Sequence, residues 1–348
     1  MKPVSSIREA QQIFDAIFQA ENNGHQSCLL MITQVKGSAY RRPGAKMMMA
    51  DDGRMVGTLS GGCLEGDLYH WAEGAMKTQI PEIHHYDLVE DDMWGLGIGC
   101  KGEIDVLVEP ITSHRAFWKG FAAALQDESP IVLSLDLPVG DRFYQIPGQN
   151  RVSLTSASQP RRAIPSLRPQ GQTLCHERVL WDYLVPPAKF VVAGAGHDAK
   201  PVAELAHRAG FEVCILDRRP LFNNAREFPW ASYWVLDERN FPPPHNWQGA
   251  FWVIMNHHQA RDEAALQLAI KNHAQYIGVL GPLSRTEEMR KNLHLSGDAD
   301  LPVYAPVGLD LGAERPEEVA LSIVSELMMV RQQASGGHLT GRHVIHAG

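Results

Sequence analysis

A cysteine follows two glycines in the segment GTLSGGCLEGDLYHWAEGAM, residues 57–76. After the glycines, apolar residues recur at the spacing of a helix with one buried face. Cys63 would then lie in the first turn of that helix, where unpaired N–H groups and the helix dipole favour a thiolate. Gly61 and Gly62 lack side chains, so a ligand could approach the backbone and the sulfur together. Glu65 opposes this by repulsion unless it bonds to the helix start or to the ligand; an inert buried thiol is the alternative.

The loop KGSAYRRPGAKM, residues 36–47, concentrates positive charge in a chain that is acidic overall. Arg41, Arg42 and Lys46 fall within a stretch of six residues. Guanidinium groups and free backbone N–H groups are what a phosphate needs, so these residues are predicted to contact a phosphorylated ligand. A solvated hairpin loop is the other interpretation.

Cys100 lies in a further glycine-rich turn, GLGIGCKGE, directly before a predicted strand. It is a candidate to contact the same ligand as Cys63. The chain has no Cys-x-x-Cys spacing, and His84 and His85 would face opposite sides of a predicted strand. Neither pattern predicts a metal site.

The turn GAGHDA, residues 194–199, has the G-x-G-x-x-A form of the dinucleotide fingerprint. It follows an apolar strand and opens a helix. Gly194 allows the tight turn, Gly196 leaves room for a pyrophosphate, and Ala199 lets the helix pack close to the strand. His197 lies within the turn and is included among the cofactor-binding candidates. A Rossmann-like fold with an empty or repurposed crevice is the alternative.

Acidic and basic residues around this turn bear on which nucleotide it could take. Asp217 ends the next strand, about 20 residues beyond the turn, where a carboxylate can accept the ribose hydroxyls. Arg218 and Arg219 could instead meet a 2′-phosphate, so NAD is favoured without excluding NADP. Asp198 would repel an anion in the turn, and Lys200 partly offsets its charge.

A histidine pair marks the end of another predicted strand in the same half of the chain. His257 and His258 follow AFWVIMN and precede Asp262. The carboxyl end of a Rossmann strand is where ligand groups gather, so His257 and Asp262 are candidate cofactor-binding residues. A polar loop beside a nucleotide is favoured over a metal site.

Composition limits the classes of function. The 348 residues carry a net charge of −8, which argues against a general affinity for nucleic acid or for an anionic membrane. Neither a secretory signal nor a membrane-spanning run is predicted. Five widely spaced cysteines fit reduced thiols in a cytoplasm better than a disulfide framework.

The order of predicted elements indicates an α/β protein with two domains. Residues 1–187 are expected to form a mixed α/β domain, with irregular surface chain over about 148–187, where Pro, Ser, Arg and Gln are frequent. Residues 188–335 should form a Rossmann-like domain with a parallel sheet. Residues 336–348 are expected to be a flexible tail.

Taken together, these motifs resemble those of the XdhC/CoxI family, the accessory proteins of xanthine dehydrogenase and related molybdenum hydroxylases. The resemblance spans roughly residues 8–330. It rests on GSAYRRPGAKM, LSGGCLEGDL, GIGCKGEIDVLVEP, the Rossmann segment from VVAGAGHDA, YIGVLGPLSR and PVGLDLGAERPEEVALSIVSEL. The chain departs from the family pattern at Tyr40, Lys101, Asn256, His258 and Pro282.

The resemblance implies a protein that binds molybdenum cofactor, assists replacement of an oxo ligand by sulfur, and delivers the cofactor to a molybdenum hydroxylase such as xanthine dehydrogenase. It implies that Arg41, Arg42 and Lys46 hold the pterin phosphate, while Cys63 with Glu65 acts on the metal or on a transferred sulfur. Such a protein would be a cytoplasmic cofactor-handling chaperone rather than a turnover enzyme. A cysteine desulfurase as a partner and a homodimer are further expectations.

Two other functions compete with this one. An NAD(P)-dependent oxidoreductase would use the Rossmann half for hydride transfer, with Cys63 or His257 near a small substrate. The sequence offers no convincing acid–base set for that reaction. Nucleotidyl transfer is disfavoured, because the Walker A pattern is absent and the glycine turn fits dinucleotides better.

Overall fold

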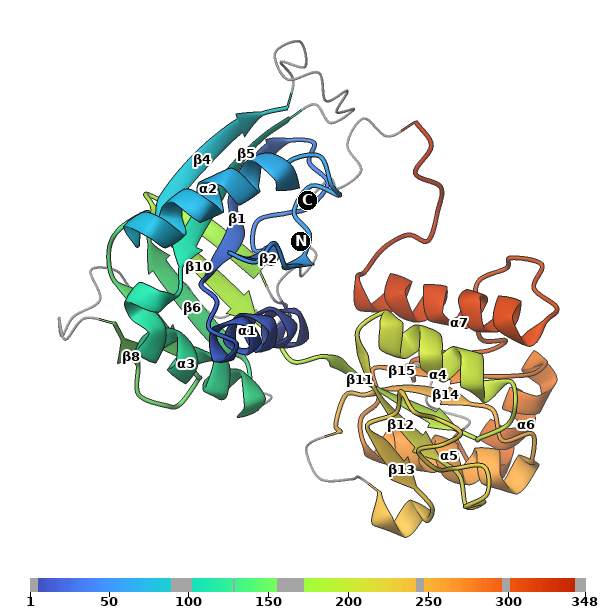
Figure 1. Ribbon diagram of the computed structural model, residues 1–348. Helices are drawn as coiled ribbons and strands as arrows, with labels where there is room; N and C mark the ends of the chain where they lie inside the picture. The colour runs from blue at the N-terminus through green and yellow to red at the C-terminus, as the bar shows by residue number, and fades with distance from the viewer. Residues whose placement is uncertain are drawn as a thin grey trace. The chain divides into compact units, whose positions relative to one another are not determined.

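The computed structural model describes residues 6–88, 102–127, 129–154, 172–241, 247–295 and 301–341. The chain divides into two compact units (Figure 1): Met1–Pro186 with Leu339–Gly348, and Pro187–His338. Within the described ranges, no helix combines the length and apolarity that a membrane crossing requires.

The first unit contains two antiparallel sheets of five strands each. One sheet has the order β3-β2-β1-β5-β4 and is formed by β1 (Ser27–Gly37), β2 (Lys46–Ala50), β3 (Met55–Gly57), β4 (Glu82–Asp87) and β5 (Gly102–Pro110). The other has the order β8-β7-β6-β10-β9 and is formed by β6 (Ile131–Asp136), β7 (Arg142–Gln145), β8 (Val152–Ser153), β9 (Gln172–His176) and β10 (Val179–Leu184).

The hairpin β9–β10 corrects the expectation of irregular chain over 148–187. Its strand β10 alternates between two environments: Leu180 and Leu184 belong to the main core, while Trp181 and Tyr183 pack in a smaller cluster on the other face. This period-two pattern is the signature of a strand buried on both faces. The surrounding Pro- and Arg-rich composition obscured it in the sequence.

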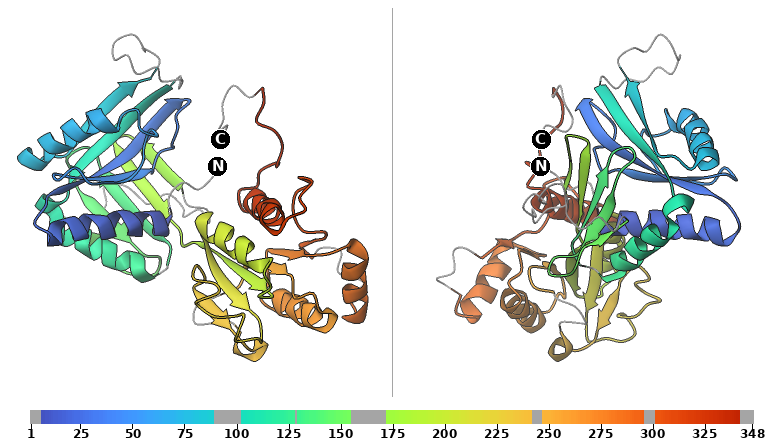
Figure 2. Two further views of the ribbon diagram at one scale, coloured as in Figure 1. Left: turned by 45° about the vertical axis from the view of Figure 1, so that its right-hand side comes forward. Right: turned by 90° about the vertical axis from the view of Figure 1, so that its left-hand side faces the viewer.

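Helices cover the sheets of the first unit. Its described helices are α1 (Ile7–Asn22), α2 (Glu65–Thr78) and α3 (Arg115–Ala124), with short 3-10 turns at η1 (Thr112–His114) and η2 (Leu125–Asp127). Helices α1 and α3 lie side by side (Figure 2), with Phe14 stacked on Trp118, and share a core with one face of β1 and with β6 and β10. Helix α2 packs on the opposite face of β1 and β5. Strand β1 is thus buried on both faces, in keeping with its apolar sequence SCLLMI.

Two fully buried ion pairs join the two sheets of the first unit. Lys46 on β2 places its Nζ 2.6 Å from Oδ2 of Asp182 on β10. Arg142 on β7 binds Glu109 on β5 with two hydrogen bonds, of 2.8 and 3.3 Å. The same guanidinium also donates to the carbonyls of Asp136, Pro138 and Gly140.

The second unit is built on a parallel sheet of six strands in the order β13-β12-β11-β14-β15-β16. Its strands are β11 (Ala188–Ala193), β12 (Phe211–Leu216), β13 (Tyr233–Val235), β14 (Phe251–Ile254), β15 (Tyr276–Val279) and β16 (Val303–Tyr304). Its described helices are α4 (Ala199–Arg208), α5 (Gln259–Lys271), α6 (Leu283–Asn292) and α7 (Pro316–Arg331), with a 3-10 turn η3 (Glu238–Asn240).

Helices cover both faces of this sheet. The apolar sides of α4 and α7 pack on one face, and those of α5 and α6 pack on the other. The strand order reverses between β11 and β14, which is the point where an open α/β sheet forms its ligand crevice. The predicted Rossmann-like fold is confirmed.

Candidate functional site

The loop before α2 folds around the carboxylate of Glu65. This carboxylate accepts hydrogen bonds from the N–H groups of Leu59 (3.2 Å), Ser60 (3.1 Å), Gly62 (2.9 Å) and Leu64 (3.2 Å), and from the hydroxyls of Thr58 (3.0 Å) and Ser60. A ring of backbone N–H groups is a typical anion site. In this protein the ring is filled by a side chain of the protein itself.

Cys63 projects from this loop rather than from the helix. Helix α2 begins at Glu65 with Leu64 as its N-cap residue, so the prediction that Cys63 lies in the first helical turn is wrong by two residues. The reason is that the N–H groups ahead of the helix bond to Glu65 instead of continuing the helical pattern. The thiol is exposed, whereas Cys28 and Cys214 are fully buried in their strands.

The two glycines before Cys63 have backbone conformations that other residues rarely adopt. Gly61 has φ +76° and Gly62 has φ +109°. The ring of Tyr40 lies beside Gly61, whereas a Cβ at Gly62 would meet open space. The need for glycine at Gly62 therefore comes from its φ angle and not from crowding.

Hydrogen bonding fixes the charge of Glu65. Burial alone would raise the pKa of this carboxyl group, but the hydrogen bonds from Ser60 and Thr58 outweigh burial and lower the pKa to about 2. Because the pKa is below the ordinary value of 4.5, the bonds of Glu65 stabilise the folded loop fully above about pH 4.5. That contribution is lost as the pH falls through about 2.

A Glu65→Gln variant is expected to have a looser loop than the parent at any pH above about 2. The amide nitrogen of glutamine cannot accept a hydrogen bond, so several donors of residues 58–64 would lose their partner. Amide hydrogen exchange at about pH 3.5, which lies above the folded pKa, should show the loop protected in the parent and unprotected in the variant. Equal protection in both proteins would contradict the assignment.

A small depression adjoins the thiol. Its lining includes Tyr40, Ser60, Cys63, Leu64 and Ile104, and its volume is about 10 Å³. That volume holds no more than one water molecule. A larger cavity of about 500 Å³ lies by the C-terminal end of α2, away from Cys63, and includes none of the predicted site residues.

The predicted phosphate-binding residues occupy different environments. Lys46 is buried and paired with Asp182, so its placement in a ligand cradle is corrected: its charge balances a carboxylate in the core. Arg41 donates to Glu9 on α1 at 2.5 Å and to the carbonyl of Thr58 at 3.4 Å. The second of these contacts places Arg41 next to the loop of Cys63.

Arg42 is half-buried, and burial lowers the pKa of its guanidinium group. Such a group still stays charged in proteins. Of the three predicted phosphate-binding residues, Arg41 and Arg42 are therefore the ones that a ligand could reach. Cys100, the other thiol proposed for this site, lies outside the described residues.

The glycine turn of the second unit has the geometry that its sequence predicts. Gly194 has φ +123°, and a Cβ on it would strike the backbone carbonyl of Met255. The turn connects β11 to α4 at the carboxyl edge of the sheet. His197 is exposed in this turn, with its ring edge-on to Phe222.

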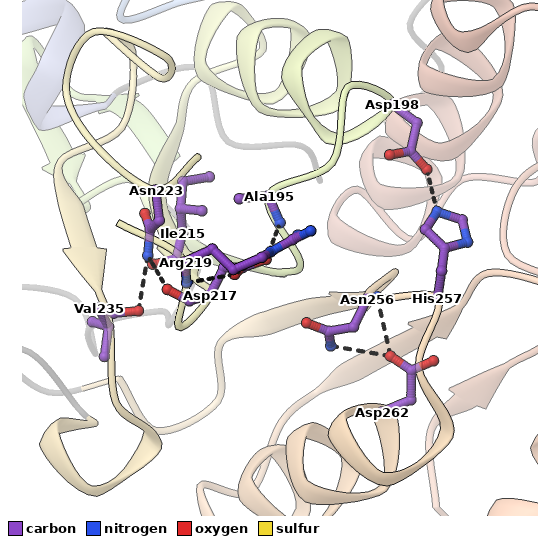
Figure 3. Close-up of polar contacts among 10 residues, drawn as sticks. All are labelled: Ala195, Asp198, Ile215, Asp217, Arg219, Asn223, Val235, Asn256, His257 and Asp262. Carbon is purple, nitrogen blue, oxygen red and sulfur yellow. Dashed lines mark hydrogen bonds and ion pairs between the residues drawn. The ribbon is translucent and has the colours of Figure 1, made fainter. Parts of the chain in front are cut away.

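Asp217, the predicted ribose acceptor, is buried and bonded to protein groups (Figure 3). Its carboxylate accepts from the N–H of Ala195 at 2.8 Å and from the Arg219 guanidinium at 2.6 and 2.9 Å. Burial would raise the pKa of Asp217, but the bonds to Arg219 and Ala195 outweigh it and hold the pKa below the usual range. A ribose hydroxyl would have to compete with these partners.

Side chains from the loop after β14 complete the crevice. His257 Nε2 lies 2.7 Å from Oδ2 of Asp198. Asp262 is buried, and it accepts from the backbone and side-chain amides of Asn256, each at 3.0 Å, and from Arg285. The prediction that Asp262 contacts a cofactor is corrected, because its carboxylate anchors the start of α5 to α6.

Each of the two units matches a known protein family or domain. Residues 20–87 match the XdhC and CoxI family, and residues 190–327 match the XdhC Rossmann domain. The chain belongs to the XdhC/CoxI family. The N-terminal match covers the loops of Arg41 and Cys63, and the C-terminal match covers the glycine turn.

Relatives of this XdhC/CoxI chain extend over nearly its whole length. A Bacillus subtilis protein, named as a probable subunit of xanthine dehydrogenase, is 29% identical over 339 residues, which are 93% of this chain and 98% of that protein. The molybdenum cofactor insertion chaperone PaoD of Escherichia coli is 24% identical over 318 residues, 90% of this chain and 86% of PaoD. A Bacillus halodurans crystal structure, described as a xanthine dehydrogenase, has a TM-score of 0.80 at 28% identity and covers 94% of this chain and 98% of its own.

The sequence of this XdhC/CoxI chain carries a signal for one feature of the loop at residues 36–47 and no signal for another. The partner of Arg41, Glu9, lies 32 residues away on helix α1, and no local pattern marks it. The burial of Lys46 had a signal: in KMMMA it shares a strand face with Met48 and Ala50, both of which lie in the core. That alternation could have placed Lys46 inside the protein.

Proposed function

We propose that this chain binds molybdenum cofactor, assists its sulfuration and delivers it to a xanthine dehydrogenase-type molybdenum hydroxylase. The observation that carries this proposal is the exposed thiol of Cys63 on a loop held rigid by Glu65. Membership of the XdhC/CoxI family and the similarity to PaoD, whose name describes molybdenum cofactor insertion, support it. The cofactor is cargo in this scheme, and the chain is a chaperone rather than a turnover enzyme.

Different residues of the first unit would bind different parts of the cofactor. Thiolates are soft ligands suited to a transition metal or to a transferred sulfur, and Cys63 supplies one. Arg41 and Arg42 would bind the phosphate of the pterin. Because the depression beside Cys63 holds only about 10 Å³, the cofactor would lie over the loop or open it on binding.

Partners and location follow from this role. The client would be a molybdenum hydroxylase, and a cysteine desulfurase would supply the sulfur. Both would meet the chain in the cytoplasm, where reduced thiols persist. A homodimer is part of the proposal. An adenine nucleotide such as NAD or NADP would bind in the crevice of the second unit at Gly194 and Gly196.

The function is tested by loading and transfer. Purified protein is mixed with molybdenum cofactor, passed through a gel-filtration column, and added to an apo molybdenum hydroxylase. Pterin and molybdenum should elute with the protein, and the eluted complex should activate the client. A protein that retains no pterin, or a client that stays inactive, would refute the proposal.

An Arg41→Ala variant should bind the phosphorylated pterin about fivefold more weakly than the parent, because it loses one charge-assisted bond. The difference should shrink at high salt, because exposed charge pairs are screened. A Glu9→Gln variant is the matched counterpart: it releases Arg41 from its partner and should strengthen binding. If a dephosphorylated pterin binds as tightly as the intact one, the loop has no role in phosphate recognition.

A further inference from the structure

The phosphate position in the second unit is taken by a side chain of the same unit. In the dinucleotide fingerprint, the second glycine lacks a side chain so that a pyrophosphate can approach the backbone. Here that glycine is Gly196, and Oδ1 of Asp198 lies so close to it that a Cβ on Gly196 would clash with this oxygen. The carboxylate thus lies against the glycine that the fingerprint leaves open for an anion.

His257 holds the carboxylate of Asp198 in this position. Its Nε2 lies 2.7 Å from Oδ2 of Asp198, and the two side chains come from different segments of the chain (Figure 3). His257 has φ +56°, a left-handed conformation that histidine adopts more often than most other non-glycine residues.

The nearby cation does not neutralise Asp198. Lys200, which the sequence suggested as an offset, is paired with Glu227. Arg219 is engaged with Asp217 at the ribose end of the crevice. A phosphate entering the turn would therefore meet the charge of Asp198 directly, unless the side chain swings away from His257.

We infer that Asp198, held in place by its contact with His257, competes with phosphate for the glycine turn of the second unit. It would keep this site closed to nucleotides until the Asp198 side chain is displaced. This inference rests on the proposed nucleotide site of the second unit. A site whose competent state is only fractionally populated binds with an affinity reduced by that fraction. Like-charge repulsion between carboxylate and phosphate adds to the reduction.

The inference is tested with ADP and NAD⁺ as probes in titration calorimetry of the full chain. An Asp198→Ala variant should bind ADP about tenfold or more tightly than the parent, because both the obstruction and the charge are removed. Asp198→Asn keeps a side chain that can bond His257 but removes the charge, and it should show an intermediate gain. His257→Ala removes the side chain that holds Asp198. It should give a smaller gain in ADP affinity, because the carboxylate of Asp198 remains nearby.

His258→Ala is the matched control, because His258 is the exposed neighbour that caps α5 without a side-chain bond, and it should leave ADP affinity unchanged. Circular dichroism of each variant checks folding. Unchanged or weaker ADP binding by both Asp198 variants would overturn the inference. If neither the parent nor any variant binds a nucleotide, the proposed nucleotide site and the competition by Asp198 are both wrong. The proposed delivery of molybdenum cofactor is a separate hypothesis, which is tested by client activation.

Discussion

A Cys63→Ser variant is expected to fold like the parent and to fail in activating an apo molybdenum hydroxylase. Serine keeps the size and the loop geometry, since the bonds that shape the loop run to Glu65 and not to the thiol. It removes the soft sulfur ligand, and loss of a group acting at a metal typically costs about 10- to 100-fold in affinity or activity. Client activation per mole of cofactor offered is the measurement.

The matched control is Cys175→Ser. Cys175 is the other exposed thiol among the described cysteines, and it lies on β9 of the second sheet, not on the glycine loop. This variant should activate the client as well as the parent does. If Cys63→Ser also activates normally, the thiol serves packing or solubility and the proposed chemistry is wrong.

An Arg142→Met variant is expected to destabilise the first unit by about 3–5 kcal/mol, the usual cost of leaving a buried charge without its partner. Glu109 would remain buried with no counter-charge, and three backbone carbonyls would lose a donor. Urea unfolding followed by limited proteolysis and mass spectrometry would show which unit unfolds first. The first unit should shift to lower urea while the second is unaffected.

A less buried pair provides the comparison for this effect. Arg115 donates to Glu21 at 2.8 Å, and its side chain is half exposed although that of Glu21 is mostly buried, so Arg115→Met should cost less than Arg142→Met. A double variant, Arg142→Met with Glu109→Leu, should recover much of the lost stability because no unpaired charge remains. Equal destabilisation by Arg142→Met and Arg115→Met would show that the buried pair contributes no more to the free energy of unfolding than the less buried pair does.

Much of the fold follows from local pattern. The apolar run SCLLMITQV predicts strand β1, the residues Asp51-Asp52-Gly53 predict the β2–β3 hairpin, and the fingerprint predicts the turn at Gly194. Each of these features depends on neighbours within a few residues. The β9–β10 hairpin was missed because its strands are defined by partners such as β6, about 40 residues earlier.

The candidate site was only partly predictable, because side chains in it bond to distant groups. Glu65 was expected to bond the helix start or a ligand, and it does bond the loop ahead of the helix. The pairing of Lys46 with Asp182 depends on two sheets coming together, which no local spacing encodes. The charge of Asp198 is evident in the sequence, but its contact with His257 required the fold to place two loops side by side.

Protection of Cys63 from alkylation tests the proposed cofactor site most directly. The protein is treated with iodoacetamide with and without bound molybdenum cofactor, and each cysteine is quantified by mass spectrometry. Cys28 and Cys214 are buried, and burial raises the pKa of both thiols, so they should stay unmodified and serve as internal controls. Cys63 is expected to react in the free protein and to be protected by the cofactor. Burial also raises the pKa of the Cys175 thiol, so Cys175 should react slowly and to the same extent in both samples. Equal labelling of Cys63 with and without cofactor would show that the cofactor does not bind at this thiol, and it would contradict the proposed role of Cys63.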